Sequence, residues 1–113
     1  MASEPDVTAR LAAERAEVAA QVVSLQQAFD DIVAGSELVS TDDEHDPEGA
    51  TIAYERAQVS SLLERARDRL ADLDVATERL IAGTYGRCER CGAPIGDARL
   101  EALPAATRCV ACA

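Results

Sequence analysis

All four cysteines of this 113-residue chain lie within its last 26 positions, where they form two C-x-x-C pairs. Cys88 pairs with Cys91 and Cys109 with Cys112, and 17 residues separate the two pairs. At this spacing each pair of thiolates can hold one side of a tetrahedral Zn²⁺ while the intervening segment loops around the ion. The pattern predicts one structural zinc ion bound by four sulfur atoms at about 2.3 Å, with no open position for catalysis.

The alternative use of such cysteines is a redox dithiol, but that chemistry is typical of a single C-x-x-C in a βαβ setting. Gly92 follows Cys91 and Gly86 precedes Cys88, and glycine permits the tight turns that a zinc knuckle needs. The segment between the pairs predicts one short helix, with Asp97 as its N-cap and Pro104 just past its end.

A second group of chemically active residues is the acidic segment 42–48. It holds five acids, namely Asp42, Asp43, Glu44, Asp46 and Glu48. A helix-helix connection does not need five like charges, which repel one another, so the segment predicts a functional tip. The structural alternative is a solvated loop that caps the next helix. His45, the single histidine, either joins Asp43 and Asp46 in holding a metal or is an exposed turn residue.

The elements that must position these groups are two long helices with matching periods. In each, apolar residues recur every seven positions with further members four residues on, which is an a/d-like stripe. The first stripe is Leu11, Val18, Val22, Leu25, Phe29 and Ile32. The second is Ile52, Val59, Leu63, Ala66, Leu70, Leu73 and Leu80.

These stripes predict a helix-dominated fold, in which a long antiparallel hairpin over 1–83 precedes a four-cysteine zinc finger over 84–113. The helices are predicted over about 5–34, starting at Pro5 or Thr8, and over about 50–82. Gly35 and Gly83 are their predicted stops, and 35–49 is the acidic tip loop. The connection is long enough for the chain to reverse its direction, and the two apolar stripes lie on different faces of their helices. Both features favour a monomer. The alternative is a homo-oligomeric coiled coil.

Composition and charge exclude several classes of protein. There are 23 Ala and three aromatic residues, so a large globular core is not expected. The net charge is −10, with 11 Arg and no Lys, which argues against a protein that gains affinity from phosphate neutralisation. The zinc module from Cys88 onward carries three Arg and three acids, so it lacks the basic face of DNA-binding GATA-type fingers with the same cysteine spacing.

Other function classes lack their sequence patterns. There is no Ser-His-Asp set and no Gly-rich phosphate loop, so no enzymatic activity is expected. The N-terminal residues are charged where a signal peptide needs an apolar run, and no 18-residue apolar stretch occurs. We therefore expect a cytosolic protein with no membrane association.

Three segments carry a resemblance to a known family, namely the tip DDEHDPEGATIAYERAQ, the following helix, and the end GTYGRCERCGAPIGDARLEALPAATRCVACA. Together they resemble the DksA/TraR family of zinc-finger transcription regulators, in the short form common in actinobacteria. The similarity is close over roughly 40–113, whereas the first helix matches in period only. The family tip pattern D-P-x-D-x-A is one residue shorter here, where Asp46, Pro47, Glu48 and Ala50 occupy it.

The resemblance implies that the hairpin enters the secondary channel of bacterial RNA polymerase. Its tip residues, Asp43, Asp46, Glu48 and Ala50, would approach the active centre and alter the stability of initiation complexes without touching DNA. At the positions that bind guanosine tetraphosphate in family members this chain has Asp72, Leu103 and Ala113, with only Arg65 basic, so coupling through that site is not expected. The alternative function is a zinc-stabilised adaptor that binds another protein without polymerase contact.

Overall fold

The computed structural model describes residues 3–38 and 47–113, and three helices lie in these two ranges. Helix α1 spans Glu4–Leu38, α2 spans Pro47–Ala82 and α3 spans Asp97–Ala102. The described residues form no strand, and Arg87 and Pro94 make one isolated antiparallel bridge. In the same two ranges no helix is both long enough and apolar enough to cross a bilayer.

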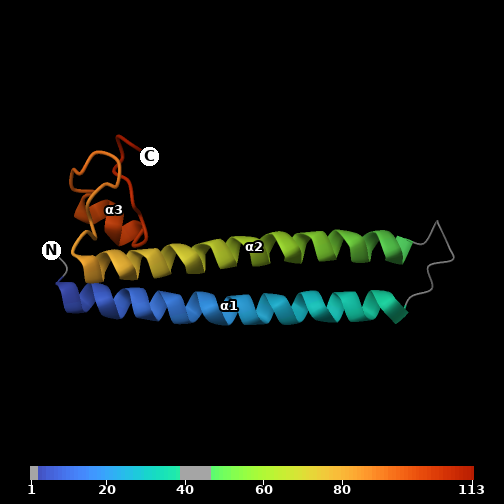
Figure 1. Ribbon diagram of the computed structural model, residues 1–113. Helices are drawn as coiled ribbons and strands as arrows, with labels where there is room; N and C mark the ends of the chain where they lie inside the picture. Colours follow the sequence, from blue (N-terminus) through green and yellow to red (C-terminus); the bar gives the residue numbers. More distant parts are fainter. Residues whose placement is uncertain (1–2, 39–46) are drawn as a thin grey trace. The chain divides into compact units, whose positions relative to one another are not determined.

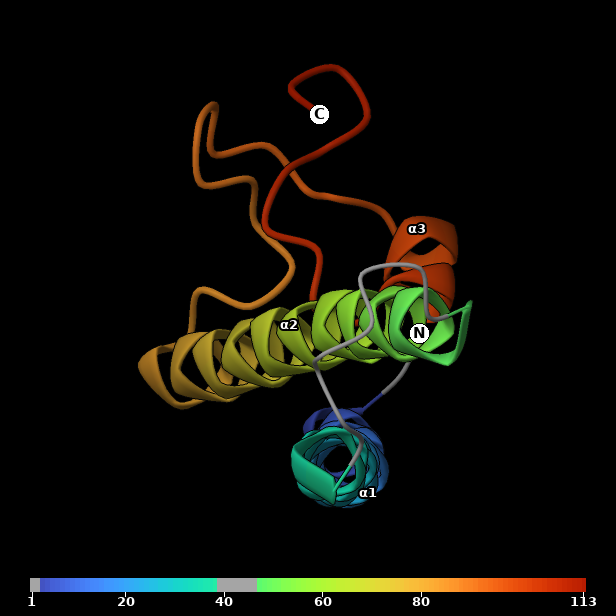
Figure 2. The same cartoon turned by 90° about the vertical axis from the view of Figure 1, so that its right-hand side faces the viewer.

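The chain divides into two compact units. The first unit joins Met1–Glu17 to Arg69–Ala113, and the second is Val18–Asp68. Within each unit α1 and α2 run alongside each other in opposite directions (Figure 1). Figure 2 looks along the helices. In both views α2 lies between the first turns of α1 and the loops of the C-terminal module. The predicted helical hairpin with a C-terminal cysteine module is thereby confirmed.

The first unit packs the beginning of α1 against the end of α2. Leu11 is 1% exposed and Leu73 is fully buried. Two ion pairs join the helices at the margin of this core: Glu14 Oε2 lies 3.0 Å from Arg69 Nη2, and Arg15 Nε lies 2.5 Å from Asp74 Oδ1. These exposed pairs each contribute at most about 1 kcal/mol, so apolar burial dominates the stability of the pairing.

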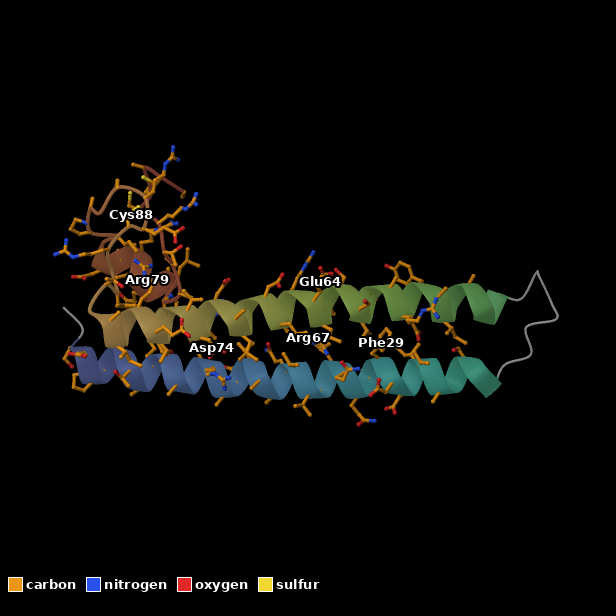
Figure 3. All side chains as sticks on the ribbon, viewed as in Figure 1. Phe29, Glu64, Arg67, Asp74, Arg79 and Cys88 are labelled. Carbon is orange, nitrogen blue, oxygen red and sulfur yellow. The ribbon has the colours of Figure 1, made fainter. Side chains whose placement is uncertain are left out.

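The second unit buries its own members of the two apolar stripes. Val18, Leu63 and Ala66 are buried there. Phe29 from α1 and Arg67 from α2 point into the space between the helices (Figure 3), and Arg67 Nη2 donates to Gln26 Oε1 at 2.5 Å. Every member of the two predicted stripes is buried or half-buried, because a period of seven keeps one side of each helix facing its partner.

Helix α2 ends at Ala82, immediately before the predicted stop Gly83, and two backbone hydrogen bonds cap it. The N–H of Thr84 donates to the carbonyl of Arg79 at 2.9 Å, and the N–H of Gly83 donates to the carbonyl of Leu80 at 3.2 Å. This is a Schellman cap, which requires a left-handed residue, and Gly83 has φ 80°. The cap turns the chain sharply out of α2 and toward the first cysteine pair.

The predicted end of the first helix is wrong. Helix α1 continues through Gly35 to Leu38, and Gly35 does not take a positive φ. Glycine inside a helix costs only about 1 kcal/mol, so without a reversed cap after it the helix goes on.

The second helix also begins earlier than predicted, at Pro47 instead of Ala50. Proline is compatible with the first turn of a helix because the first N–H groups have no intrahelical acceptor. The predicted tip loop of 35–49 therefore includes helical residues at both ends, and its remaining part, residues 39–46, lies outside the described residues.

Candidate metal centre

The first cysteine pair sits in a tight turn closed by backbone hydrogen bonds. Cys88 N–H donates to the carbonyl of Ala93 at 2.8 Å, and Gly92 N–H donates to the carbonyl of Cys88 at 2.9 Å. Gly92 has φ 75°, which residues with a Cβ rarely adopt. The turn thus brings the side chains of Cys88 and Cys91 to the same side of the chain, as predicted from the glycine after the pair.

A second turn presents the other pair, and the two turns are joined. Cys112 N–H donates to the carbonyl of Cys109 at 3.0 Å, which closes the second turn. Glu89 N–H donates to the carbonyl of Thr107 at 2.8 Å, and Arg108 Nε lies 2.9 Å from Glu89 Oε1. Backbone and side-chain contacts therefore hold the two turns face to face.

The four sulfur atoms all lie within 4.8 Å of one another. The Sγ atoms of Cys91 and Cys109 are 3.7 Å apart. Four sulfurs at about 2.3 Å from one tetrahedral zinc are separated by about 3.8 Å along each edge, so this distance suits a shared ion. The donor set is sulfur only and fills all four positions, which is typical of a structural site.

The electrostatics of the cluster also favour a cation at its centre. Backbone N–H groups of Cys109 and Cys91 lower the pKa of the Cys88 thiol to about 6. Hydrogen bonds with the side chains of Cys109 and Cys91 raise the pKa of Cys112 to about 12. The backbone thus stabilises one thiolate, while the crowding of four sulfurs opposes further ionisation. A divalent cation supplies the positive charge that allows all four to ionise.

Apolar side chains surround the sulfur cluster. Cys88, Ile95 and Cys109 are buried together, and three partly buried residues pack against them, namely Leu100, Ala106 and Cys112. Cys91 is the exposed member of the four cysteines. The module therefore has a core of its own, although it is too small to fold without a further constraint such as a metal.

Helix α3 lies between the cysteine pairs where the sequence predicts it, but its predicted N-cap is wrong. Gly96, with φ 102°, is the cap residue and no side chain caps the helix, while Asp97 is the first helical residue. The turn before α3 requires a positive φ, which glycine adopts at no steric cost and aspartate does not. Asp97 still favours the helix as an acid in its first turn.

Sequence reasoning missed the side chains that attach this module to the helices. Arg79 of α2 points toward the module (Figure 3), and its Nη2 donates to the carbonyls of Thr84, at 3.2 Å, and Arg87. Tyr85 Oη donates to the carbonyl of Pro104 at 2.8 Å. Partial burial raises the pKa of Tyr85, so its hydroxyl remains a donor at neutral pH. All three acceptors are backbone carbonyls, which no sequence motif reveals.

The predicted tip residues are only partly placed. Ala50 lies exposed in the first turn of α2, and Glu48 lies in the same turn. Asp43, Asp46 and His45 lie outside the described residues. The predicted grouping of these side chains as one functional tip therefore stays a prediction.

The module and the long helices both match known proteins. Residues 83–113 match the prokaryotic dksA/traR C4-type zinc finger. The structure of the transcription factor DksA2 from Pseudomonas aeruginosa superposes with a TM-score of 0.79 and 33% sequence identity, over 96% of this chain and 78% of that one.

The chain belongs to the DksA/TraR family. Among curated proteins, the RNA polymerase-binding transcription factor DksA of Caulobacter vibrioides is 45% identical over 61 residues, which is 54% of this chain and 43% of that protein. General stress protein 16O of Bacillus subtilis is 34% identical over 68 residues, which is 60% of this chain and 42% of that protein. The matches thus span less than half the length of these two relatives.

Family membership and geometry agree on the metal. The DksA/TraR finger is of the C4 type, and its match covers all four cysteines. The same four residues form the sulfur cluster. The predicted single structural zinc ion is therefore confirmed as the cofactor of this module.

Proposed function

We propose that the chain regulates transcription by binding bacterial RNA polymerase in the cytoplasm, with its helical hairpin inserted into the secondary channel. The observation that carries the proposal is the extent of the similarity to DksA2, which includes α1 and α2 as well as the finger. The Caulobacter relative is an RNA polymerase-binding transcription factor. A match limited to the zinc finger would have supported a metal site but no particular partner.

The acidic connection between α1 and α2 is the part that we expect to act in the channel. Asp43 and Asp46 give it negative charge, Glu48 adds a further acid in the first turn of α2, and Ala50 in the same turn has a small side chain. Carboxylates at this position would interact with the cations and basic side chains of the polymerase active centre and alter the stability of initiation complexes. We propose no catalytic step for this chain, because its sulfur-only zinc site has no open position.

Direct DNA binding and alarmone binding are not part of the proposal. The finger carries equal numbers of Arg and acidic residues from Cys88 onward, so it offers little attraction to phosphates. At the positions expected to bind guanosine tetraphosphate, Asp72 adds a negative charge and Leu103 is an apolar residue. We therefore expect the same effect on transcription with and without this nucleotide.

Neutralising the tip should abolish regulation without unfolding the protein. We expect Asp46→Asn with Glu48→Ala to remove the effect on abortive initiation by matched RNA polymerase, because the charge that meets the active centre is lost. Helicity and zinc content should stay at wild-type values, since both changes replace acidic side chains and leave the two apolar stripes and the four cysteines intact. The measurement is the yield of abortive products with increasing protein, alongside circular dichroism and metal analysis.

Glu64→Ala is the control, because Glu64 is an exposed acid of α2, the helix that also holds Glu48, and it points away from α1 (Figure 3). This variant should regulate like wild type. Polymerase subunits should co-purify with the tagged wild-type chain and should diminish with the tip variant. If the tip variant binds and regulates normally, channel insertion is wrong; if no polymerase co-purifies with the wild type, the adaptor alternative is favoured.

We also propose that the protein acts as a monomer. The apolar stripes of α1 and α2 are buried against each other within one chain, so they are not available to a second copy. The residues on the opposite sides of both helices are exposed. Sedimentation equilibrium of the zinc-loaded protein is expected to give the mass of one chain, 11.9 kDa, across the micromolar range. A mass that doubles at low micromolar concentration would instead support the oligomeric coiled coil.

A further inference from the structure

Arg10, in the first turns of α1, contacts the zinc module more than 80 residues away in the sequence. Its Nη1 donates to the carbonyl of Leu100 at 3.5 Å, and its Nη2 donates to the carbonyl of Glu101. Both acceptors belong to α3, which lies between the two cysteine pairs. A single guanidinium thus joins the start of the chain to the segment that separates the zinc ligands.

The two carbonyls have no partner within α3 because they lie in its last turn. The last carbonyls of a helix have no intrahelical donor. The carbonyl of Arg99, in α3, accepts from the N–H of the cap residue Leu103 at 2.7 Å, and the carbonyl of Leu103 accepts from Ala106 N–H at 3.0 Å. Those of Leu100 and Glu101 accept from Arg10. A cation at this end also interacts favourably with the helix dipole.

The same part of α3 depends on the metal cluster for its position. The Leu100 side chain packs against the core of Cys88, Ile95 and Cys109. The Leu100 side chain also lies close to Gly86, where an added Cβ would be 3.4 Å from Leu100 Cδ1. Because two of the metal-ligating cysteines, Cys88 and Cys109, belong to this core, we expect the position of Leu100, and with it of its carbonyl, to depend on the closed metal site.

On the helix side, Arg10 belongs to a chain of charges that reaches α2. Arg10 Nε lies 3.7 Å from Glu14 Oε1, and Glu14 Oε2 lies 3.0 Å from Arg69 Nη2. Arg10 is therefore shared by α1, by α3 and, through Glu14, by α2. By contrast, Arg15 contacts Asp74 of α2 alone and has no contact with the module among the described residues.

We propose that Arg10 couples zinc occupancy to the order of the first turns of α1. With zinc bound, α3 presents two fixed carbonyls to Arg10, and α1 is held at its beginning. When zinc is removed, the module loses its core and the carbonyls lose their fixed position, so the first turns of α1 lose these bonds and fray. By linkage, the same contact strengthens zinc binding by the same factor. This coupling concerns the base of the hairpin and does not depend on polymerase binding.

Hydrogen exchange of the full chain, followed by mass spectrometry on peptides from residues 4–17, tests the coupling. In the wild type, a chelator should accelerate exchange over these residues by roughly tenfold, the protection expected from charge-assisted hydrogen bonds. In Arg10→Gln at saturating zinc, exchange should already be fast, and chelation should change it by less than about twofold. Metal analysis should still find one zinc per chain, bound with an affinity lowered by roughly tenfold.

Two variants distinguish this role from general support of the helix. Arg15→Gln removes an arginine contact made by the same turns of α1, but it leaves the contacts with α3 intact. Chelation should therefore accelerate exchange over residues 4–17 by the same factor in this variant as in wild type. Arg10→Lys keeps a cation that reaches one carbonyl at a time. The acceleration of exchange on chelation should therefore lie between those of wild type and Arg10→Gln. The proposal is overturned if Arg10→Gln with zinc exchanges like wild type, or if chelation accelerates wild type and Arg10→Gln equally.

Discussion

Replacing Cys109 with serine is expected to remove the zinc and unfold residues 84–113, while α1 and α2 stay helical within the second unit. Cys109 is 9% exposed, and its sulfur lies 3.7 Å from that of Cys91 at the centre of the module. Structural zinc contributes roughly 10–16 kcal/mol to the folding of zinc-finger peptides, which a core of this size cannot replace. The zinc content found by metal analysis should fall from one ion per chain to none, and the protection of backbone amides in the module from hydrogen exchange should disappear.

The control for this experiment is Ala111→Ser, which introduces the same hydroxyl in the same turn without removing a sulfur. Ala111 is exposed, so this variant should keep its zinc and its amide protection. Far-UV circular dichroism of Cys109→Ser should retain most of the helical signal, since α1 and α2 hold most of the helical residues. If Cys109→Ser retains one tightly bound zinc, the assignment of this residue as a ligand is wrong.

Leu73→Ala should produce the largest loss of stability among changes in the helix pair. Leu73 is fully buried, and its removal leaves a cavity that the rigid helices cannot close. Leucine-to-alanine changes at such sites cost about 3–5 kcal/mol. Urea unfolding at saturating zinc, followed by circular dichroism, should therefore show a much lower midpoint than wild type.

Val75→Ala is the matched control, because it lies two residues away in the same helix and the same unit but is 44% exposed. It loses little buried area and gains helix propensity, so the expected change is under about 1 kcal/mol. Equal losses for the two variants would show that Leu73 is not in the interior of the helix pair.

The sequence was sufficient to predict the helix pairing and the metal site because both depend on local spacing. The period of seven put Leu11 and Leu73 on facing stripes, and these are the two most buried large side chains in the described residues. The spacing within each C-x-x-C pair, with Gly92 after the first, predicted the turns that gather the sulfurs. In each case the residues that cooperate are separated by fixed steps of a regular element or a tight turn.

The features that were not predicted depend on geometry that spacing does not encode. Gly35 and Gly83 look alike in sequence, yet only Gly83 takes a positive φ, because only there does the chain fold back into a capped turn. Likewise, nothing near Arg10 in the sequence indicates that its acceptors are carbonyls of Leu100 and Glu101. Backbone acceptors carry no side-chain signature, so contacts to them emerge only once the fold is known.

The distribution of tyrosine gives the protein a built-in pair of optical reporters. The chain has no tryptophan and two tyrosines, of which Tyr85 belongs to the first unit and Tyr54, 69% exposed, to the second. Excitation near the tyrosine absorption band therefore samples one fluorophore in each unit, and Tyr54→Phe leaves an emission signal that comes from the metal-bearing half alone. The melting of that half can then be followed without labelling and compared with the loss of helical ellipticity, which measures both halves together.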